Sequence, residues 1–558
     1  MTRQRKFGSL AAIGGSIAAI VLLAGSSAAR ADELADLRAN QELLQKRIDQ
    51  LSQAPPPAPG PFVPGFGPET RPPGAPVTTG SFPRSFLIPG TDTSLRIGGL
   101  VRTTVQWYAS GASNGGQLNN QGGQINHTFF DGPGGTGNLN SIPLNNTIAH
   151  SRSSTFDISP RTSRVLLDAR TPTAWGEAKA YIEFDWAVNN TNTVDSSTTG
   201  VASGWLNRLR KGYATLGGFL AGQETGIMHD PDADPELADQ GGMATAAGRA
   251  RVPQIRYTYQ GPYGTVFTAG FENPIPDVAT TFGNTYLDVN QIPNIATCTA
   301  NVFPAGSVVQ NDIACLGNIA FFSPLQTTMP DWVATARINQ PWGHLQVGGV
   351  VRSERLNDGQ GLNQAFVGYG GTISGDVHPF SGNPGPLGKD DLGFGFTAGN
   401  GIGSQIPNGT GMVATNFGRN LFVPGVGFVN PLTNPAWLAR APAAAAIVNG
   451  INVRRAYDAQ VRSETATPVG AWIWYQHWWT NELRSTLSAS GLQTGFNSNL
   501  LGQGSTVNKQ LSITHANLFW SPVAFMDFGV EYVWGHRVTQ ANFKGDSNTI
   551  VGTMVVRF

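Results

Sequence analysis

Apolar and polar residues alternate in short segments that recur from residue 94 to the end of the chain. In the first segment, Ile97, Val101 and Trp107 share one face. Arg96 and Arg102 lie on the other face. Because successive side chains of a β-strand point to opposite faces, such a segment predicts a strand with one apolar and one polar face. The same alternation occupies residues 164–170, 179–186, 332–339, 345–352, 516–520, 526–534 and 548–558.

The connections between these segments are short after one segment and long after the next. Short connections lie around Trp175, around Trp342 and at residues 521–523, and the long ones lie between them. Transmembrane β-barrels have this organisation, with short turns at one end and longer loops at the other. Several Trp and Tyr residues stand at the ends of the segments, where an aromatic girdle would meet the membrane interface.

The composition supports a barrel over a soluble sandwich. Only 13% of the residues are charged, against roughly 25% in typical soluble domains. Beyond the N-terminal region no apolar run reaches 18 residues, which excludes a helical membrane protein. We therefore predict an all-β protein, a transmembrane antiparallel β-barrel over residues 94–558. Sixteen strands would leave about 29 residues for each strand and its loop, and eighteen also fit because residues 355–465 are poorly periodic.

Three segments precede the predicted barrel. Residues 1–31 carry a basic start, an apolar core and a small-residue cleavage pattern, as in a secretory signal peptide. Residues 32–53 have leucines at heptad spacing and predict a short coiled-coil helix, the alternative being a single amphipathic helix packed on a domain. Residues 54–93 are rich in Pro and Gly and predict a semi-rigid linker. Removal of the signal peptide leaves a mildly acidic chain, so we expect no nucleic-acid partner.

The C-terminal segment ends on Phe558, and its last strand resembles the closing strand of bacterial outer-membrane β-barrels. In those proteins the final Phe belongs to the signal that the barrel-assembly machinery reads. The resemblance therefore places the chain in the outer membrane, surrounded by lipid and lipopolysaccharide.

Three further motifs narrow the resemblance. They are Leu95-Arg96-Ile97-Gly98-Gly99, the run 173–183 and the run 208–216 followed by 220–223. With the coiled-coil helix and the Pro-rich linker, they resemble the DcaP-like trimeric porins. The resemblance implies a homotrimer of sixteen-stranded barrels that admits small anionic solutes such as dicarboxylates, without a chemical step. The expected function is thus passive diffusion through an outer-membrane porin.

Arginines dominate the charged positions on the polar faces of the predicted strands. A guanidinium on a pore wall attracts anions and can bind a carboxylate bidentately. The competing interpretation is that these arginines brace the wall by pairing with nearby acids such as Asp168, Glu183 and Asp185. The arginines that we expect to line the pore and steer solutes are Arg96, Arg102, Arg164, Arg170, Arg256, Arg337 and Arg352, with Arg208 or Arg210 as further candidates.

Residues 225–250 are the candidate for a constriction loop that folds into the pore. This segment contains Asp230, Asp232 and Asp234, whose carboxylates would oppose the arginines across the lumen. Their spacing copies the first three ligands of an EF-hand, but Pro235 and Gly241 replace residues that the motif requires. An irregular Ca²⁺ site in this acidic loop stays open, beside a solvated loop without metal, and no other metal or cofactor is expected.

The two cysteines, Cys298 and Cys315, lie in one irregular stretch. In an exported protein we expect them to form a single loop disulfide. The eight His residues show no metal-ligand spacing of a known hydrolase, and no nucleophile elbow is present. His515 and Ser521 are the nearest approach to a catalytic pair, and Gly393 to Ala398 match a dinucleotide fingerprint only formally. We therefore predict that the protein is not an enzyme.

Two other outer-membrane roles compete with that of a porin. An energised receptor needs a plug domain, which residues 32–93 are too short to form. A structural barrel that tethers the outer membrane through the coiled-coil helix remains the alternative. Deletion of residues 32–93 distinguishes the two, because a tether would lose envelope stability whereas a porin would lose only trimer stability or gating.

Overall fold

The computed structural model describes residues 80–111, 142–147, 150, 154–189, 205–239, 242–246, 248–275, 278–280, 286–287, 321–322, 325–357, 363–415, 421–423, 427–429, 447–448, 451–452, 462–495 and 508–558. The predicted signal peptide, the coiled-coil helix, most of the linker and both cysteines lie outside these residues. No helix among the described residues is long and apolar enough to cross a membrane.

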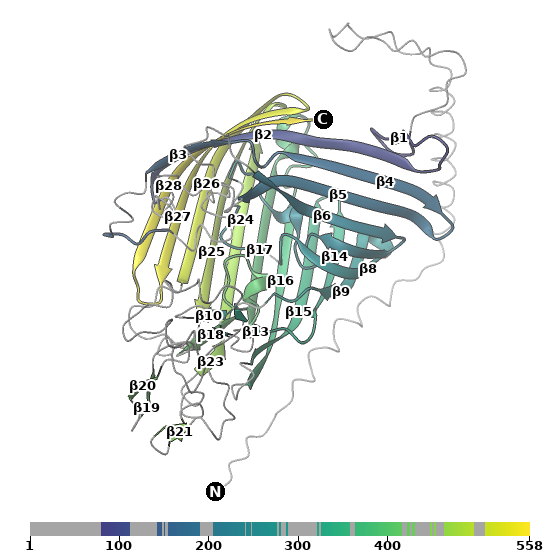
Figure 1. Cartoon of the computed structure of the whole chain (residues 1–558). Helices are drawn as coiled ribbons and strands as arrows, with labels where there is room; N and C mark the ends of the chain where they lie inside the picture. Colours follow the sequence, from purple (N-terminus) through teal and green to yellow (C-terminus); the bar gives the residue numbers. More distant parts are fainter. Residues whose placement is uncertain are drawn as a thin grey trace, which may run out of the picture. The chain divides into compact units, whose positions relative to one another are not determined.

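Sixteen antiparallel strands of the described chain pair in a closed ring. Each strand pairs with the next, and the ring closes where β2 pairs with β28, from Leu100 opposite Arg557 to Ser110 opposite Asn548 (Figure 1). The predicted barrel is confirmed, with sixteen strands rather than eighteen. The strands are β2 (Ser94–Ser110), β4 (Arg164–Thr173), β5 (Gly176–Asn189), β6 (Trp205–Leu216), β7 (Phe219–Glu224), β8 (Val252–Gln260), β9 (Thr265–Glu272), β14 (Asp331–Gln340), β15 (Gly343–Asn357), β16 (Asn363–Val377), β17 (Asp391–Asn400), β24 (Thr467–Trp478), β25 (Leu483–Gly495), β26 (Asn508–Val523), β27 (Met526–Thr539) and β28 (Lys544–Arg557).

Shorter elements extend or decorate this ring. β1 (Phe86–Leu87) pairs with β2, so the end of the predicted linker is part of the sheet. β3 (Thr155–Ser159) pairs with β2 and continues the direction of β4. β13 (Leu325–Gln326) pairs with β15 and continues the direction of β14. The others are β10 (Val278–Thr280), β11 (Tyr286–Leu287), β12 (Phe321–Phe322), β18 (Met412–Thr415), β19 (Leu421–Val423), β20 (Gly427–Val429), β21 (Ile447–Val448), β22 (Ile451–Asn452), β23 (Arg462–Thr465), and the 3₁₀ turns η4 (Pro231–Ala233), η5 (Pro262–Gly264), η8 (Pro386–Lys389) and η9 (Gly403–Gln405).

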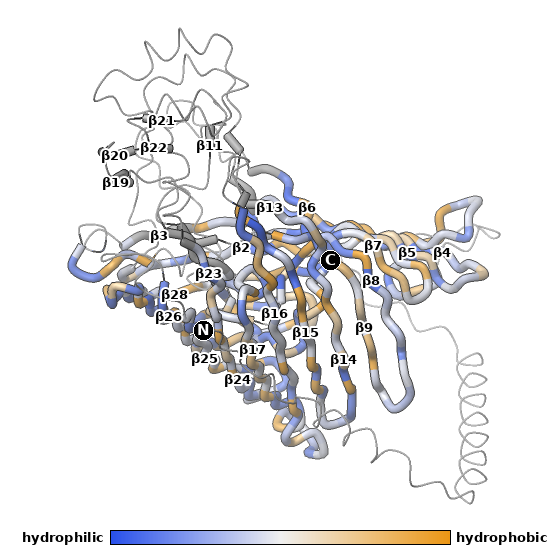
Figure 2. The backbone as a smooth tube through the Cα atoms, turned by 90° about the horizontal axis from the view of Figure 1, so that it is seen from below, coloured by the Kyte–Doolittle hydropathy of each residue, from blue (hydrophilic) through white to orange (hydrophobic). Residues whose placement is uncertain are grey.

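The alternation of the sequence becomes an outer and an inner face of the ring. On β2, Ile97 and Val101 are more than half exposed on the outside, whereas Thr104 and Gln106 are buried on the inside. Bands of opposite hydropathy alternate in the same way along β9, β14 and β15 (Figure 2). The inner face is polar and the outer face apolar, as a barrel with a wet lumen in lipid requires.

The two ends of the ring differ in the length of their connections. At one end, two-residue turns join β4 to β5, β6 to β7, β14 to β15 and β26 to β27. Exposed aromatic residues stand in or beside these turns, among them Trp175, Trp342 and Phe525. We call this the short-turn end. The long connections, including residues 225–251, leave from the opposite end, as the sequence predicted.

Candidate functional site

The candidate site is the lumen at the level of residues 225–251, which join β7 to β8. We call these residues the inward segment, because their contacts lie on the inner faces of strands β9, β14 to β16 and β24 to β27. The segment contains η4 and several residues with almost no exposed surface, including Met228, Asp230 and Ala233. It therefore crosses from one part of the wall to the other inside the ring.

Asp230 provides the first anchor of the inward segment. Its carboxylate lies 2.8 Å from Nε2 of His344, accepts a hydrogen bond of 2.7 Å from Ser374 and pairs with Arg337 at 3.1 Å. Burial acts to raise the pKa of Asp230, but the hydrogen bonds from His344 and Ser374 and the charges of His344 and Arg337 outweigh it. The pKa is held below its ordinary value of 3.8, so Asp230 is ionised at neutral pH.

Ala233 provides the second anchor. Its carbonyl oxygen accepts hydrogen bonds from the indole nitrogens of Trp472 and Trp474, at 3.1 and 2.8 Å. Both indoles lie against β17, where Gly393 and Gly395 leave room that any Cβ would fill. The glycines of the apparent dinucleotide fingerprint therefore serve to pack these two rings.

Buried acids of the wall and the segment provide the third anchor. The carboxylate of Glu531 accepts hydrogen bonds from the backbone N–H groups of Ala238 and Asp239, at 3.1 and 2.9 Å. Earlier in the inward segment, the carboxylate of Glu236 accepts a hydrogen bond of 2.6 Å from Nε of Arg484. The segment is thus held by side chains on β25 and β27, far from β7 in the chain.

His515 belongs to this anchor as well. Its ring lies 3.0 Å from the hydroxyl of Ser488 and 3.5 Å from the carboxylate of Asp239. The arrangement resembles a Ser-His-Asp triad, but all three residues are buried and no substrate could reach them. Ser521, which the sequence set beside His515, instead donates a hydrogen bond to Asp527. We assign these groups to the support of the inward segment.

The return of the inward segment toward β8 is fixed by Arg249. This guanidinium pairs with Asp331 at 2.6 Å and donates to the carbonyl oxygen of Asn273. Arg352 lies in the same cluster, against Asp331 and Glu354, and is fully buried. A solute cannot reach Arg352, so the structure corrects its predicted role as a solute-steering residue and makes it a wall brace.

The acidic residues of the inward segment do not converge on a metal position among the described residues. Asp232 is 61% exposed and, like Asp230, pairs with Arg337, at 2.6 Å. Asp234 pairs with His229 at 3.0 Å. Arg337 therefore lies beside Asp230 and Asp232 and helps to hold the inward segment. The sequence predicted instead that these acids would face Arg337 from the other side of the pore. These contacts offer no support for a Ca²⁺ site.

A group of arginines faces the lumen from strands β2, β4 and β6 and from the end of the inward segment. We call it the basic wall, and its members are Arg102, Arg164, Arg208, Arg210 and Arg251. Arg208 and Arg210 pair with Asp185 at 2.8 Å each, and Arg210 also pairs with Glu183. Among the described residues, no carboxylate lies within 4 Å of Arg102 or Arg251, so the wall keeps an excess of positive charge.

Arg251 shows this excess most clearly. Burial is the main effect that lowers its pKa, and the positive charges of Arg210, Arg208 and Arg164 lower it further, to about 10. A guanidinium with such a pKa is still protonated at neutral pH. The sequence had not assigned Arg251 to the pore, because it is out of phase with Val252, Gln254 and Arg256, which point inward on β8.

A second basic group lies nearer the short-turn end, around Asp168. Arg170 binds this carboxylate with two nitrogens, at 3.0 and 2.9 Å. Lys179 and Arg96 lie 3.8 and 3.7 Å from it. Arg96 and Arg170 are thus on the inner face, and each remains about 30% exposed. Arg256, by contrast, lies 3.9 Å from Glu224 and belongs to neither group.

Except for Arg251, which ends the inward segment, the basic wall and the contacts of the inward segment lie on different strands of the ring. The wall lies on β2 to β6, and the segment covers β14 to β16 and β24 to β27. In the order of the ring, β4 and β16 are half a circumference apart. The lumen at this level is therefore bordered by arginines on one side and by a segment with the exposed carboxylate of Asp232 on the other.

Comparison with known proteins agrees with this architecture. A model of the porin subfamily matches residues 84–355, and a model of the DcaP outer membrane protein matches residues 460–555. No curated protein matches the chain. The structure is similar to the outer membrane channel DcaP of Acinetobacter baumannii, with a TM-score of 0.54 and 17% identity over 85% of this chain and 99% of that one. OmpT of Vibrio cholerae has a TM-score of 0.40 and 7% identity, over 85% of this chain and 99% of that one.

Proposed function

Because this chain belongs to the DcaP-like porins of the bacterial outer membrane, we propose that it admits small hydrophilic solutes by passive diffusion and prefers anions, dicarboxylates in particular. The basic wall carries this proposal. Its arginines outnumber the acids that they contact, and the lumen concentrates the field of these uncompensated charges on a passing solute.

Two basic groups along one wall suit a solute with two carboxylates. The first group surrounds Asp168 nearer the short-turn end, and the second contains Arg102, Arg164 and Arg251. A guanidinium binds a carboxylate through two parallel hydrogen bonds, which favours planar carboxylates over halide ions. We propose that a dicarboxylate moves from one group to the other and that each stay is short, so that it interrupts the ion current only transiently.

The test is the reversal potential of the purified channel in a planar bilayer across a KCl gradient, with and without succinate. We expect anion selectivity and transient block by succinate for the unmodified protein. The double variant Arg164→Gln and Arg251→Gln should lose most of both effects. Arg355→Gln is the matched control, because Arg355 is bonded to Asn363 outside the basic wall. Cation selectivity of the unmodified protein would refute the anion preference.

We also propose that the channel is a homotrimer that packs through strands β7, β8, β9 and β14. Two of these strands, β7 and β9, have only six and eight residues, whereas a tilted membrane-spanning strand needs about 9–11 residues. An apolar outer groove of about 730 Å³ lies over them, lined by residues that include Phe271, Trp332 and Tyr369. A second copy of the chain would cover the part of the wall where β7 and β9 are too short to span lipid.

The trimer is tested with two matched pairs of outward-facing aromatic residues. Phe271 and Trp332 have ring centroids 4.3 Å apart in the groove, and Trp520 and Phe528 are 5.7 Å apart elsewhere on the outer face. Replacement of Phe271 and Trp332 by Ala should yield monomers on unheated gels and in light scattering. The same change at Trp520 and Phe528 should leave trimers. Trimers from both variants would exclude this interface.

A further inference from the structure

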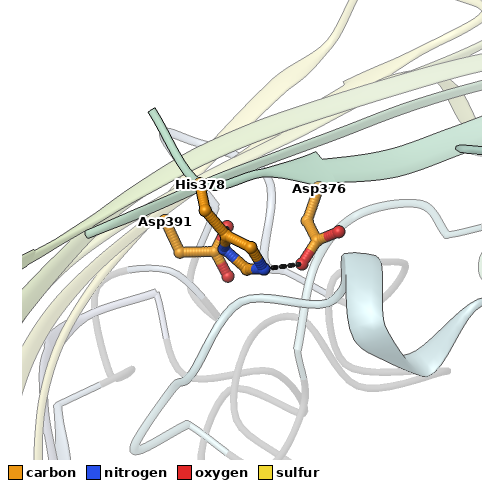
Figure 3. A group of neighbouring side chains, drawn as sticks. All are labelled: Asp376, His378 and Asp391. Carbon is orange, nitrogen blue, oxygen red and sulfur yellow. Dashed lines mark ion pairs between the residues drawn. The ribbon is translucent and has the colours of Figure 1, made fainter. Parts of the chain in front are cut away.

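Three side chains with metal-ligating atoms meet on the inner face of the ring at the short-turn end. Asp376 is on β16, His378 follows that strand, and Asp391 opens β17 (Figure 3). Asp376 and His378 are two residues apart and therefore share a face, and Asp391 stands beside them on the neighbouring strand. Among the described residues this is the one such group of three.

The separations of the three groups fit the coordination shell of a single ion. Nδ1 of His378 lies 3.3 Å from Oδ1 of Asp391, and Nε2 lies 3.7 Å from Oδ2 of Asp376. One ligand atom from each residue can be chosen within 4.8 Å of the others. Two ligands of a tetrahedral zinc ion, each about 2.0–2.1 Å from the metal, are about 3.3 Å apart. Because these two separations involve different nitrogens of His378, its half-exposed ring must turn so that one nitrogen faces both carboxylates.

An ion pair among the three side chains explains the arrangement less well. Charge-assisted hydrogen bonds are about 2.7–2.9 Å long, and both measured separations are longer. Oδ1 of Asp391 is buried and accepts no hydrogen bond. Oδ1 of Asp376 is already bound by the backbone N–H of His344 at 2.9 Å and by its ring, which leaves Oδ2 directed at His378. Such a partner behind a ligating carboxylate is typical of metal sites.

We propose that Asp376, His378 and Asp391 bind a divalent transition-metal ion of the zinc class. An imidazole with two carboxylates suits Zn²⁺ and its neighbours, whereas Ca²⁺ takes a shell of six to eight oxygen atoms. Three protein ligands leave one position open to water or to a carboxylate from the lumen. The site is also linked to the inward segment, because His344 contacts Asp376 with one nitrogen and Asp230 with the other.

The experiment uses the folded, full-length protein in detergent. The protein is first treated with a chelator and is then titrated with Zn²⁺ alone, and the heat of binding is measured by calorimetry. We expect one high-affinity equivalent per chain. His378→Ala should weaken it by more than the about tenfold to hundredfold loss that removal of an outer-shell partner causes. His477→Ala is the matched control, because His477 contacts Asp390 instead, at 2.8 Å, and should bind Zn²⁺ as the unmodified protein does.

A second measurement identifies the ligand atom. Cu²⁺ bound at this site should show hyperfine coupling to one imidazole nitrogen, and the coupling should disappear in His378→Ala. Heat-modifiable gel mobility verifies that each variant is folded, and Asp391→Asn provides an independent ligand variant. Absence of Zn²⁺ binding by the unmodified protein, or equal binding by His378→Ala, would overturn the proposal.

Discussion

Nε2 of His344 lies 2.8 Å from Oδ2 of Asp230, while the other nitrogen of the same ring contacts Asp376. One imidazole on β15 therefore joins the inward segment to β16. The contact defines where the segment sits in the lumen, because Asp230 is otherwise held only by Ser374 and Arg337 among the described residues.

Acidification should release this junction. A carboxyl group whose pKa is lowered by folding stabilises the anchored state above its ordinary pKa, 3.8 for Asp230, and loses that contribution as the pH falls through its folded pKa. We expect single-channel conductance to be steady from pH 8 to pH 5 and to become noisy only below the ordinary pKa of 3.8, where Asp230 is protonated in the folded protein. Asp230→Asn should be noisy already at pH 7. Identical pH profiles for both proteins would contradict the assignment.

Glu531 should be essential for the position of the inward segment. Its carboxylate accepts two backbone N–H groups, from Ala238 and Asp239, which Glu531→Ala would leave buried without an acceptor. Each unsatisfied group costs about 1–3 kcal/mol, so the denaturant midpoint should fall and the open-channel current should fluctuate. Glu482→Ala is the control, because Glu482 lies in an exposed turn and the one hydrogen bond of its side chain among the described residues comes from the nearby Thr480. Equal midpoints for the two variants would argue against the anchor.

Gly395 should not tolerate a methyl group. A Cβ at this position would overlap the indole ring of Trp472, which donates to Ala233 of the inward segment. Gly395→Ala should destabilise the folded barrel by about 1–3 kcal/mol, as overpacked cores do, measured by denaturant unfolding. Gly491→Ala is the matched control on the outer face of β25, where the nearest atom to a new Cβ is 3.8 Å away. If both variants unfold together, the close packing has no energetic role.

Anion selectivity should weaken with ionic strength. The proposed preference arises from fixed charges on the basic wall, and mobile ions screen such charges over about 10 Å at 0.1 M salt but over about 3 Å at 1 M. The permeability ratio of chloride to potassium should therefore approach one in molar KCl. A ratio that stays constant from 0.1 to 1 M would mean that pore size, rather than charge, selects the ions.

The sequence predicted the wall far better than the lumen. Alternation at residues such as Ile97 and Arg96 is a local property of one strand, so it determines which face a side chain occupies. The position of Arg352 within a buried cluster depends on Asp331 on the neighbouring strand, and no local pattern encodes that contact. Arg251 was missed for the opposite reason, because it turns inward just before the regular alternation of β8 begins.

The poorly periodic region hid two strands for a physical reason. β16 and β17 carry glycines at inward positions, including Gly393 and Gly395, where the indoles of β24 need space. A glycine has no side chain that marks a position as apolar or polar. The alternation of apolar and polar residues is therefore not visible in the sequence, although the strands are regular. Between the end of β17 and residue 466, none of the described residues forms a further strand of the ring.

The pairing of Leu100 with Arg557 constrains the order of assembly. Every other ring neighbour follows its partner along the chain, so hairpins can form one after another. β2, however, has no partner on that edge until β28 is in place, and β28 has none until β2 reaches it. Until then the sheet has two open edges with unpaired N–H and C=O groups, which invite pairing with other chains. The two open edges must be kept from pairing with other chains during assembly. The barrel wall is closed in the membrane only when β2 and β28 pair.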